Sequence, residues 1–227
     1  MKKFAIILLI ISLNINGQKK VLDHKDFDIW NRIQNSQISS NGDFIMYSLQ
    51  RGEEDSFLKI KDKNANLIFE HDRADKGVFS YNSKYAIFVV KEWNDTITEM
   101  KRRKVKKGKM PMDSLGIFNL QNKTLVKISN IKSYKNPEKW SGYLAYTYDS
   151  TNKHKKDTIK EKKINKKPSS KNGYPLIIRN LDTEKEDTIP FVLDYTFSKK
   201  EKFISYVSSG ENNSKKPGVY IKDLINN

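Results

Sequence analysis

Cysteine is absent from the 227-residue sequence, which therefore has no disulfide framework, no thiolate zinc site, no Cys nucleophile and no Cys for lipid attachment. Histidine occurs only three times, as His24, His71 and His154, with no pair at the helical or hairpin spacing of metal ligands. We therefore expect no metal and no cofactor. The mean hydropathy of -0.74 excludes a multipass membrane protein, while 11 Tyr and 11 Phe are typical of a globular chain with a real core.

Acidic residues are also few, because 27 Asp and Glu stand against 43 Lys and Arg, a formal net charge of +16. The excess of positive charge is concentrated in a few segments. Seven positive side chains and no negative one lie in residues 101–109, and a second Lys-rich run covers residues 152–171. We expect two basic loop insertions, at residues 98–113 and 150–173, that are solvated and disordered. Neither run interleaves aromatic residues, so we expect no nucleic acid partner; specific anion binding is the alternative.

The amino terminus has the layout of a secretory signal. Lys2 and Lys3 precede a short apolar run at residues 4–15, which is too short to span a bilayer comfortably. We predict a signal peptide over residues 1–17, cleaved after Gly17. The protein would then be exported, periplasmic or secreted, with no integral membrane span once the signal is removed. A buried amino-terminal strand or an uncleaved anchor is the alternative.

Residues 18–38 are predicted to form a lead-in segment rather than a domain. Phe27, Trp30 and Ile33 recur at three-residue intervals behind Asp26, a suitable N-cap residue. This spacing predicts a short amphipathic turn of helix.

One sequence phrase occurs four times after the lead-in. It joins a polar turn to a strand-like run of aromatic and β-branched residues, at residues 39–48, 79–89, 140–147 and 197–207. The spacing between copies falls to about 40 residues once the Lys-rich insertions are removed. A second strand-like phrase follows each copy, at residues 57–60, 116–120, 176–181 and 219–224. A third follows the first three copies, at residues 66–69, 123–128 and 184–189.

A repeat of about 40 residues with three or four short strands and no helix between them has the period of a propeller blade. Each blade has two faces that must be buried against its neighbours, so the repeated aromatic and aliphatic residues are expected to form the core between blades. We predict an all-β fold, a partial β-propeller of about four blades with the last one incomplete, over residues 39–227. A β-sandwich is the alternative, but that fold does not require the same sequence phrase to occur four times.

Two phrases resemble the propeller repeats of the prolyl oligopeptidase (S9-type) family of serine peptidases. They are Ser-x-Asn-Gly-x-Phe-Ile-x-Tyr at residues 39–47 and Val-Tyr-Ile-x-Asp-Leu at residues 219–224. The resemblance covers nearly the whole chain after the signal, and residues 30–49 are similar to the opening of exported members. In that family the propeller precedes a carboxy-terminal α/β-hydrolase domain with a Ser, Asp and His triad. The resemblance implies that such a domain is missing from this chain, which we expect to be truncated within its last blade.

No catalytic residue is carried over from the resemblance. A nucleophile elbow requires Gly-x-Ser-x-Gly, and none of the ten glycines has Ser two residues on. None of the three histidines lies in a segment resembling the family's catalytic His loop. Glu53, Glu54 and Asp55 are similar in type to the paired Glu of the dipeptidyl branch, but they follow Gly52 in a hairpin loop, where we expect them to face water. The chain is predicted to have no catalytic, cofactor-binding or metal-binding residues and to be no enzyme by itself.

The function that these expectations support is the non-catalytic propeller portion of an exported prolyl oligopeptidase-like serine peptidase. The propeller would be a scaffold and substrate gate for the missing hydrolase domain, which would be its partner together with a peptide substrate. The alternative is a stand-alone exported propeller that displays its loops to a protein or glycan partner. Closure of the propeller into a ring distinguishes the two hypotheses, because an open propeller exposes unpaired strand edges.

Overall fold

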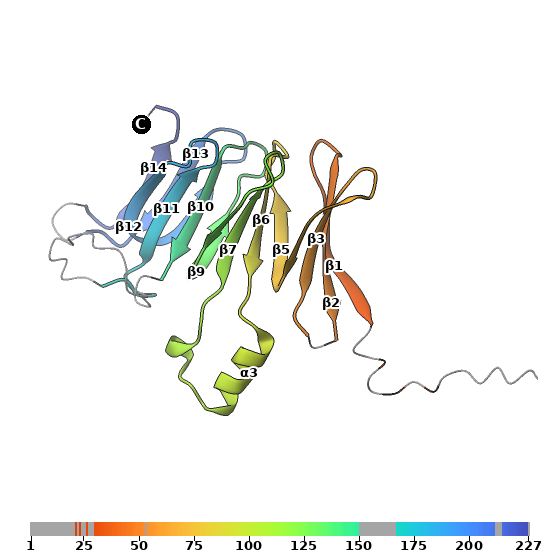
Figure 1. The fold of residues 1–227 in the computed structure, drawn as a ribbon. Helices are drawn as coiled ribbons and strands as arrows, with labels where there is room; N and C mark the ends of the chain where they lie inside the picture. Colours follow the sequence, from red (N-terminus) through yellow and green to blue (C-terminus); the bar gives the residue numbers. More distant parts are fainter. Residues whose placement is uncertain are drawn as a thin grey trace, which may run out of the picture.

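The structure is a computed structural model that describes residues 21, 23, 26, 30–52, 54–149, 167–211 and 215–226. The predicted signal peptide, most of the second basic insertion, His24 and His154 lie outside these residues. Antiparallel strands make up most of the described fold, and they form three sheets that stand side by side like a fan (Figure 1).

The first two sheets are four-stranded meanders in sequence order. The first contains β1 (Asn31–Ile38), β2 (Phe44–Arg51), β3 (Phe57–Asp62) and β4 (Leu67–Asp72). The second contains β5 (Ala74–Phe79), β6 (Tyr85–Val90), β7 (Ser114–Asn119) and β8 (Leu125–Ile128). Between β6 and β7 the chain leaves the sheet as an arm that holds helix α3 (Asn94–Arg102) and the 3-10 turn η1 (Lys107–Lys109). We call residues 91–113 the basic arm.

The third sheet has six strands and comprises two blades. Its strands are β9 (Ile131–Lys135), β10 (Tyr143–Tyr148), β11 (Tyr174–Asn180), β12 (Glu186–Phe197), β13 (Phe203–Ser208) and β14 (Gly218–Asp223). The long β12 pairs with β11 through its first half and with β13 through its second half, and the register breaks between Val192 and Asp194. The first half of β12 is therefore the last, outer strand of the third blade, and its second half is the first, inner strand of the fourth. The predicted partial propeller of about four blades, with the last one incomplete, is confirmed.

The polar turn of the repeated phrase has the same hydrogen bonds in the first two blades. Ser39 Oγ accepts the backbone N–H of Phe44 at 2.9 Å, and Ser80 Oγ accepts that of Tyr85 at 3.0 Å. The third residue after each serine has a positive φ, 75° in the first turn and 57° in the second. Short polar residues or glycine meet both requirements, which explains why the phrase repeats.

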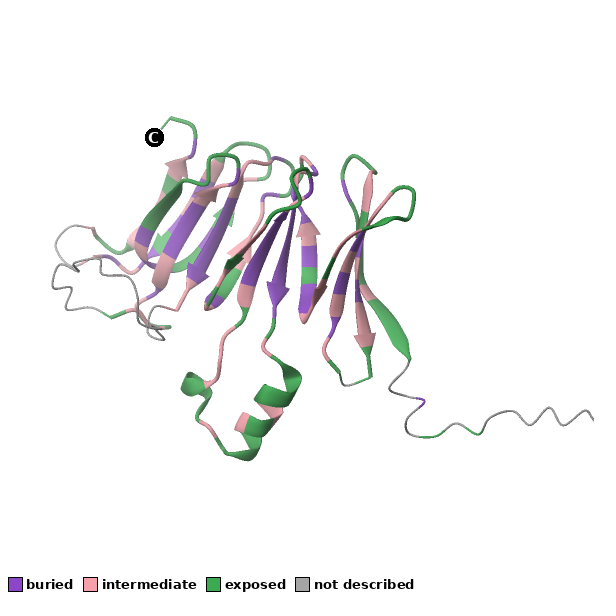
Figure 2. Cartoon of the chain, viewed as in Figure 1, coloured by how far each residue is buried: buried purple, intermediate pink, exposed green. Residues whose placement is uncertain are grey.

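The hydrophobic core lies between the blades, as the two-sided repeat predicts. All six residues of β6 are buried, and they alternate between two neighbours (Figure 2). Phe88 packs with Met46 and Leu58 of the first blade, whereas Ile87 packs with Leu144 of the third. A further cluster around Ile204 joins the third blade to the fourth. Since each buried Leu, Ile or Phe side chain contributes about 1.5–3 kcal/mol, these clusters stabilise the blades only as a stack.

The outer faces of the first and last blades carry exposed apolar side chains. On the first blade Ile38 pairs with Ile45, which places both on the face turned away from the core, and they are 66% and 40% exposed. On the fourth blade Val207 pairs with Val219 beside Ile221, and the last two are 72% and 74% exposed. These two faces have the composition of an inter-blade face without a described neighbour.

The expectation of a separate lead-in over residues 18–38 is wrong for its last part. Residues 31–38 are β1, the first strand of the first blade, so the propeller begins before residue 39. The helical turn expected from Asp26 to Ile33 gives way to this strand at Asn31, and among these residues Asp26 is the one described as helical. The apolar spacing covered only three residues, and pairing with β2 satisfies the backbone groups on the facing edges of the two strands.

The first basic insertion at residues 98–113 is not the disordered loop that was expected. Its first part continues α3, and the backbone N–H of Val105 donates to the carbonyl oxygen of Met100 just beyond the helix end. The run of like charges is tolerated because all seven Lys and Arg side chains of residues 101–109 are exposed to solvent. Most of the other insertion lies outside the described residues.

Candidate functional site

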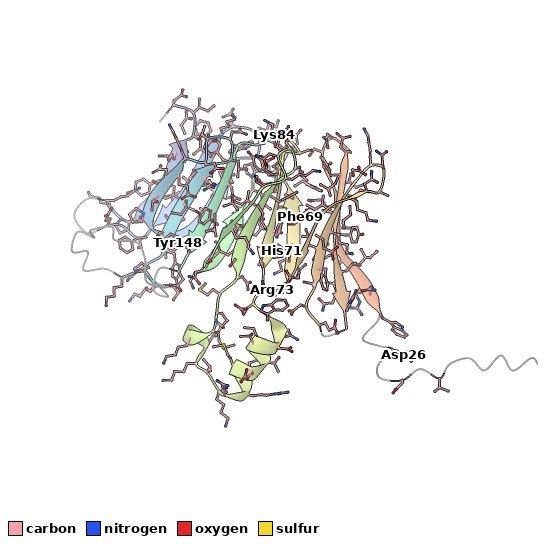
Figure 3. The ribbon with its side chains drawn as sticks, in the orientation of Figure 1. Asp26, Phe69, His71, Arg73, Lys84 and Tyr148 are labelled. Atoms are coloured by element: carbon pink, nitrogen blue, oxygen red, sulfur yellow. The ribbon has the colours of Figure 1, made fainter. Side chains whose placement is uncertain are left out.

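The connections between the second and third strands of the blades gather at one end of the fan. We call it the arm end, since the basic arm leaves from it, and the opposite end, with the polar turns, the turn end (Figure 1). Figure 3 places Arg73 at the arm end and Lys84 at the turn end. Ligand-binding residues of a repeat protein are most often found in such loops.

A pocket of about 320 Å³ lies at the arm end, between the first blade and the root of the basic arm. Its lining residues are mostly polar or charged, and the charged side chains are two cations and four carboxylates. They are Arg73, Lys91, Glu54, Asp55, Glu92 and Asp113. Partial desolvation raises the pKa of the Asp113 carboxyl, against the opposing effect of the positive Lys91 and Lys76.

Asp55 positions the basic arm. Its Oδ1 accepts the backbone N–H of Asn94, the first residue of α3, at 3.0 Å. Trp93, the residue before the helix, offers no side-chain cap, so an acid from the first blade supplies it. The expectation that the acidic loop only faces water is therefore wrong for Asp55. It holds for the exposed Glu54, whereas Glu53 lies outside the described residues.

Arg73 links the first blade to the arm across the same pocket. Its Nη1 donates to the carbonyl oxygen of Lys91 at 3.1 Å, and its guanidinium carbon lies 4.3 Å from the ring centre of Trp93. Glu92 is an ion-pair partner at 3.7 Å. The residue has a positive φ of 59°, a conformation that costs free energy and is kept here by these contacts. The root of the arm is thus held in place by specific contacts with Arg73.

The first strand of each blade is its inner strand, nearest the axis of the fan. The inner strands β1, β5 and β9 form a second polar surface. Side chains of one inner strand bond to the next: Asn35 Nδ2 donates to Asp75 Oδ1 at 2.7 Å, and Gln37 Oε1 accepts the N–H of Phe79 at 2.8 Å. Farther along, the hydroxyl of Tyr134 donates to the carbonyl oxygen of Lys76 at 2.8 Å. These bonds make a continuous wall from β1 through β5 to β9.

A pocket of about 450 Å³ opens on this wall between the first three blades, and its lining residues include Gln37, Tyr81, Tyr134 and Asn136. Burial, followed by the negative charge of Asp75, raises the pKa of Tyr134 to about 12. The pKa of Asp75 is lowered: burial opposes the shift, but bonds from Lys91, Lys76 and Asn35 outweigh it. Tyr134 is therefore neutral and Asp75 ionised near neutral pH, so neither exchanges a proton there.

His71 is the one histidine among the described residues, and it lies beside two phenylalanine rings and the carboxylate of Asp72. It lies on β4 with its ring 6.2 Å from that of Phe69 and 5.9 Å from that of Phe88 (Figure 3). Its Nδ1 faces the carbonyl oxygen of Asp72, and its Nε2 lies 3.5 Å from Lys127 Nζ. A general base in a hydrolase needs a hydroxyl nucleophile within hydrogen-bond reach, and the recorded partners of this ring include none.

The described part of the chain lacks two further features. No group of three or more His, Asp or Glu side chains there is arranged to hold a metal ion. No helix in the same residues has the length and apolar character needed to cross a membrane.

No protein-family model and no curated protein matches this sequence. Solved structures do match. A structure of prolyl endopeptidases aligns with a TM-score of 0.50 and 12% identity, over 88% of this chain and 29% of that one. The β-propeller domain of the Trilobed protease from Pyrococcus furiosus gives 0.47 and 12%, over 85% and 53%. An acylaminoacyl peptidase from Pyrococcus horikoshii gives 0.46 and 11%, over 89% and 32%.

These likenesses concern the fold, because identities near 12% carry no information on activity. The chain spans about half or less of the length of the proteins that it matches. The sheets described above define the class of protein as an open, partial β-propeller, and the match to the prolyl endopeptidase structure agrees with that fold.

Sequence reasoning assigned no site residue, and it missed the bonds between inner strands. The sequence did contain one signal for these bonds, the spacing of the bonded residues. Asn35 and Asp75 are 40 residues apart, and Gln37 and Phe79 are 42 apart. These separations equal the repeat period of about 40, so residues one period apart lie in equivalent strands of neighbouring blades.

Proposed function

We propose that the chain is the non-catalytic propeller portion of an exported prolyl oligopeptidase-like serine peptidase. Its role would be structural: the blades form a scaffold, and the wall of inner strands limits which peptides pass to an α/β-hydrolase domain on the same polypeptide. The chain itself carries out no hydrolysis.

The observation that carries this proposal is the pair of apolar faces on the first and fourth blades, which no described residue covers. Ile38 and Ile45 on one face, and Val219 and Ile221 on the other, have the character of inter-blade core. Additional blades would remove these side chains from water, at a gain of about 0.8 kcal/mol for each buried methylene group. The polar wall of β1, β5 and β9 supports the gating role, since hydrogen bonds between blades hold it in one conformation.

The first test is to read the encoding gene past the codon for Asn227. The expected result is further blade repeats in frame, followed by a Gly-x-Ser-x-Gly segment. A stop codon with no such sequence downstream would overturn the proposal in favour of a stand-alone propeller that binds a protein or glycan partner.

The second test is enzymatic and uses the full reading frame. The complete protein should hydrolyse a Pro-containing peptide, and replacing the elbow serine with alanine should abolish the activity. Residues 18–227 alone should show none, and hydrolysis by that chain would refute its inertness. Export is tested separately: sequencing of the mature amino terminus should start at Gln18, and a product that retains Met1 would contradict the signal peptide.

A further inference from the structure

The basic arm projects from the arm end of the fan as the most prominent element there (Figure 1). Its tip is defined by seven cations within nine residues, and each of them is exposed. They are Lys101, Arg102, Arg103, Lys104, Lys106, Lys107 and Lys109.

Apolar residues hold the arm together from inside. Met100, Val105 and Met110 are half-buried in the arm, and the carbonyl oxygen of Met100 accepts the N–H of Val105 at 3.0 Å. The tip therefore presents charge to its surroundings and no exposed apolar wedge. Any partner of the tip must be bound through electrostatic attraction.

Intramolecular acids compensate little of this charge. Within the described part of the chain, Arg103 is the one cation of the tip that has a recorded ion pair, with Glu99 one turn earlier on α3. Both side chains are exposed, and such pairs are weak. The other cations of the tip are exposed, and cations of this kind displace the counterions condensed on an anionic partner, whose release favours binding.

Other blades add positive charge at the same end. Lys167 and Lys171 lie in the connection between β10 and β11, and Lys216 lies in the connection between β13 and β14, which correspond to the arm in the next two blades. All three are exposed. The two Lys-rich insertions, which look unrelated in the sequence, thus belong to the same connection of consecutive blades.

We infer that the arm end is a docking surface for an anionic phospholipid bilayer. The arm projects beyond the strands (Figure 1), which suits contact with an extended charged plane. A soluble polyanion chain is typically held in a basic groove, but the pocket beside the arm is lined by carboxylates, among them Glu54, Glu92 and Asp113. Clustered Lys and Arg within a Debye length of about 8–10 Å of anionic headgroups are attracted to the surface. This inference does not depend on the proposed peptidase.

The test is binding to lipid vesicles of the chain from Gln18 onward, which contains every described strand. One set of vesicles contains about one third phosphatidylglycerol in phosphatidylcholine, and the other is pure phosphatidylcholine. The arm variant replaces the seven cations of the tip with glutamine. The matched control replaces seven exposed lysines of the turn end with glutamine: Lys63, Lys123, Lys139, Lys185, Lys199, Lys200 and Lys202. Both variants lose the same formal charge.

The wild type should sediment with the anionic vesicles at low salt and not with the neutral ones, and the binding should weaken as salt rises. The arm variant should bind at least about tenfold more weakly, while the control should bind like the wild type. Equal weakening in both variants would show binding by net charge alone and would overturn the inference. Absence of wild-type binding would also overturn it.

Three further controls keep the test decisive. Circular dichroism and thermal melting show whether the arm variant keeps its fold, and the double variant Arg102→Lys, Arg103→Lys should retain vesicle binding because it keeps the charge. The same proteins are also applied to a heparin column. Retention that depends on the arm, without vesicle binding, would assign the tip to a soluble polyanion and reject the bilayer.

Discussion

The hydroxyl of Tyr85 in β6 donates a hydrogen bond to the carbonyl oxygen of Leu181 in the following blade, at 2.7 Å. One blade later Tyr143 holds the same place, and its hydroxyl donates to the carbonyl oxygen of Leu224 at 2.6 Å. Each leucine directly follows the third strand of its blade. The bond is thus a repeated tie from the second strand of one blade to the third strand of the next. It fixes how adjacent blades stack.

Replacing Tyr85 with phenylalanine should therefore lower the stability of the whole propeller. The ring stays buried, but the Leu181 carbonyl loses its donor, which should cost about 1 kcal/mol of unfolding free energy. Tyr143→Phe should cost a similar amount, and urea unfolding measures both. Tyr81→Phe is the control, because Tyr81 is 49% exposed in a turn. If the control lost as much as Tyr85→Phe, the tie between blades would not be the cause.

Gly116 in the middle of β7 is required by the ring of Phe88. The two residues are cross-strand partners, and a Cβ built on Gly116 would overlap three atoms of that ring. Gly116→Ala should therefore destabilise the protein by about 1–3 kcal/mol through overpacking. Gly108→Ala, in the arm, has no atom within 4 Å of the added Cβ and should change stability by less than about 0.5 kcal/mol. Thermal melting that finds the two variants equal would refute the packing argument.

The propeller itself could be predicted from the sequence because its determinants are local. The serine and the positive-φ position of the turn are visible in the first two copies of the phrase, and a strand-like run of aromatic and β-branched residues, such as β6, is visible in every copy. The first strand of each blade was missed, and β1 shows why. Seven of its eight residues are exposed and the sequence NRIQNSQI has no regular alternation, so pairing with β2 rather than burial makes it a strand.

The functional surfaces could be predicted only in part. The charge of the arm tip is visible in the sequence, but its helix depends on Asp55, which is 39 residues away in another blade. The pockets combine residues from two or three blades, such as Gln37 with Tyr134, and only the stacking of the blades brings these together. Long-range contacts of this kind leave no local pattern.

Asp55 can be tested as the residue that orders the arm. Asp55→Ala removes the cap of α3, which should cost about 0.5–2 kcal/mol of local stability. The arm should then open more often, and trypsin should cut between Lys101 and Lys109 several-fold faster, while the melting temperature changes little. Glu54→Ala is the neighbouring control and should leave the cleavage rate unchanged. Equal rates in the two variants would contradict the capping role.

The buried tyrosines predict a loss of stability in alkaline solution. The pKa of Tyr134 in the fold is raised from 10.0 to about 12, chiefly by burial, and burial also raises that of Tyr195 to about 12. The fold therefore favours the neutral phenol. This contribution is fully present below pH 10.0, the unfolded value, and is lost as the pH rises through about 12.

Urea unfolding measured across that window should show a falling free energy for the wild type. Tyr134→Phe should start from a lower stability, because the hydrogen bond to the Lys76 carbonyl is lost. Its stability should then fall less steeply as the pH rises, because no phenol ionises at position 134. The exposed Tyr81→Phe variant should keep the wild-type slope. An unchanged slope in Tyr134→Phe would mean that the inner wall is open to water at Tyr134, since burial is the main reason for its raised pKa.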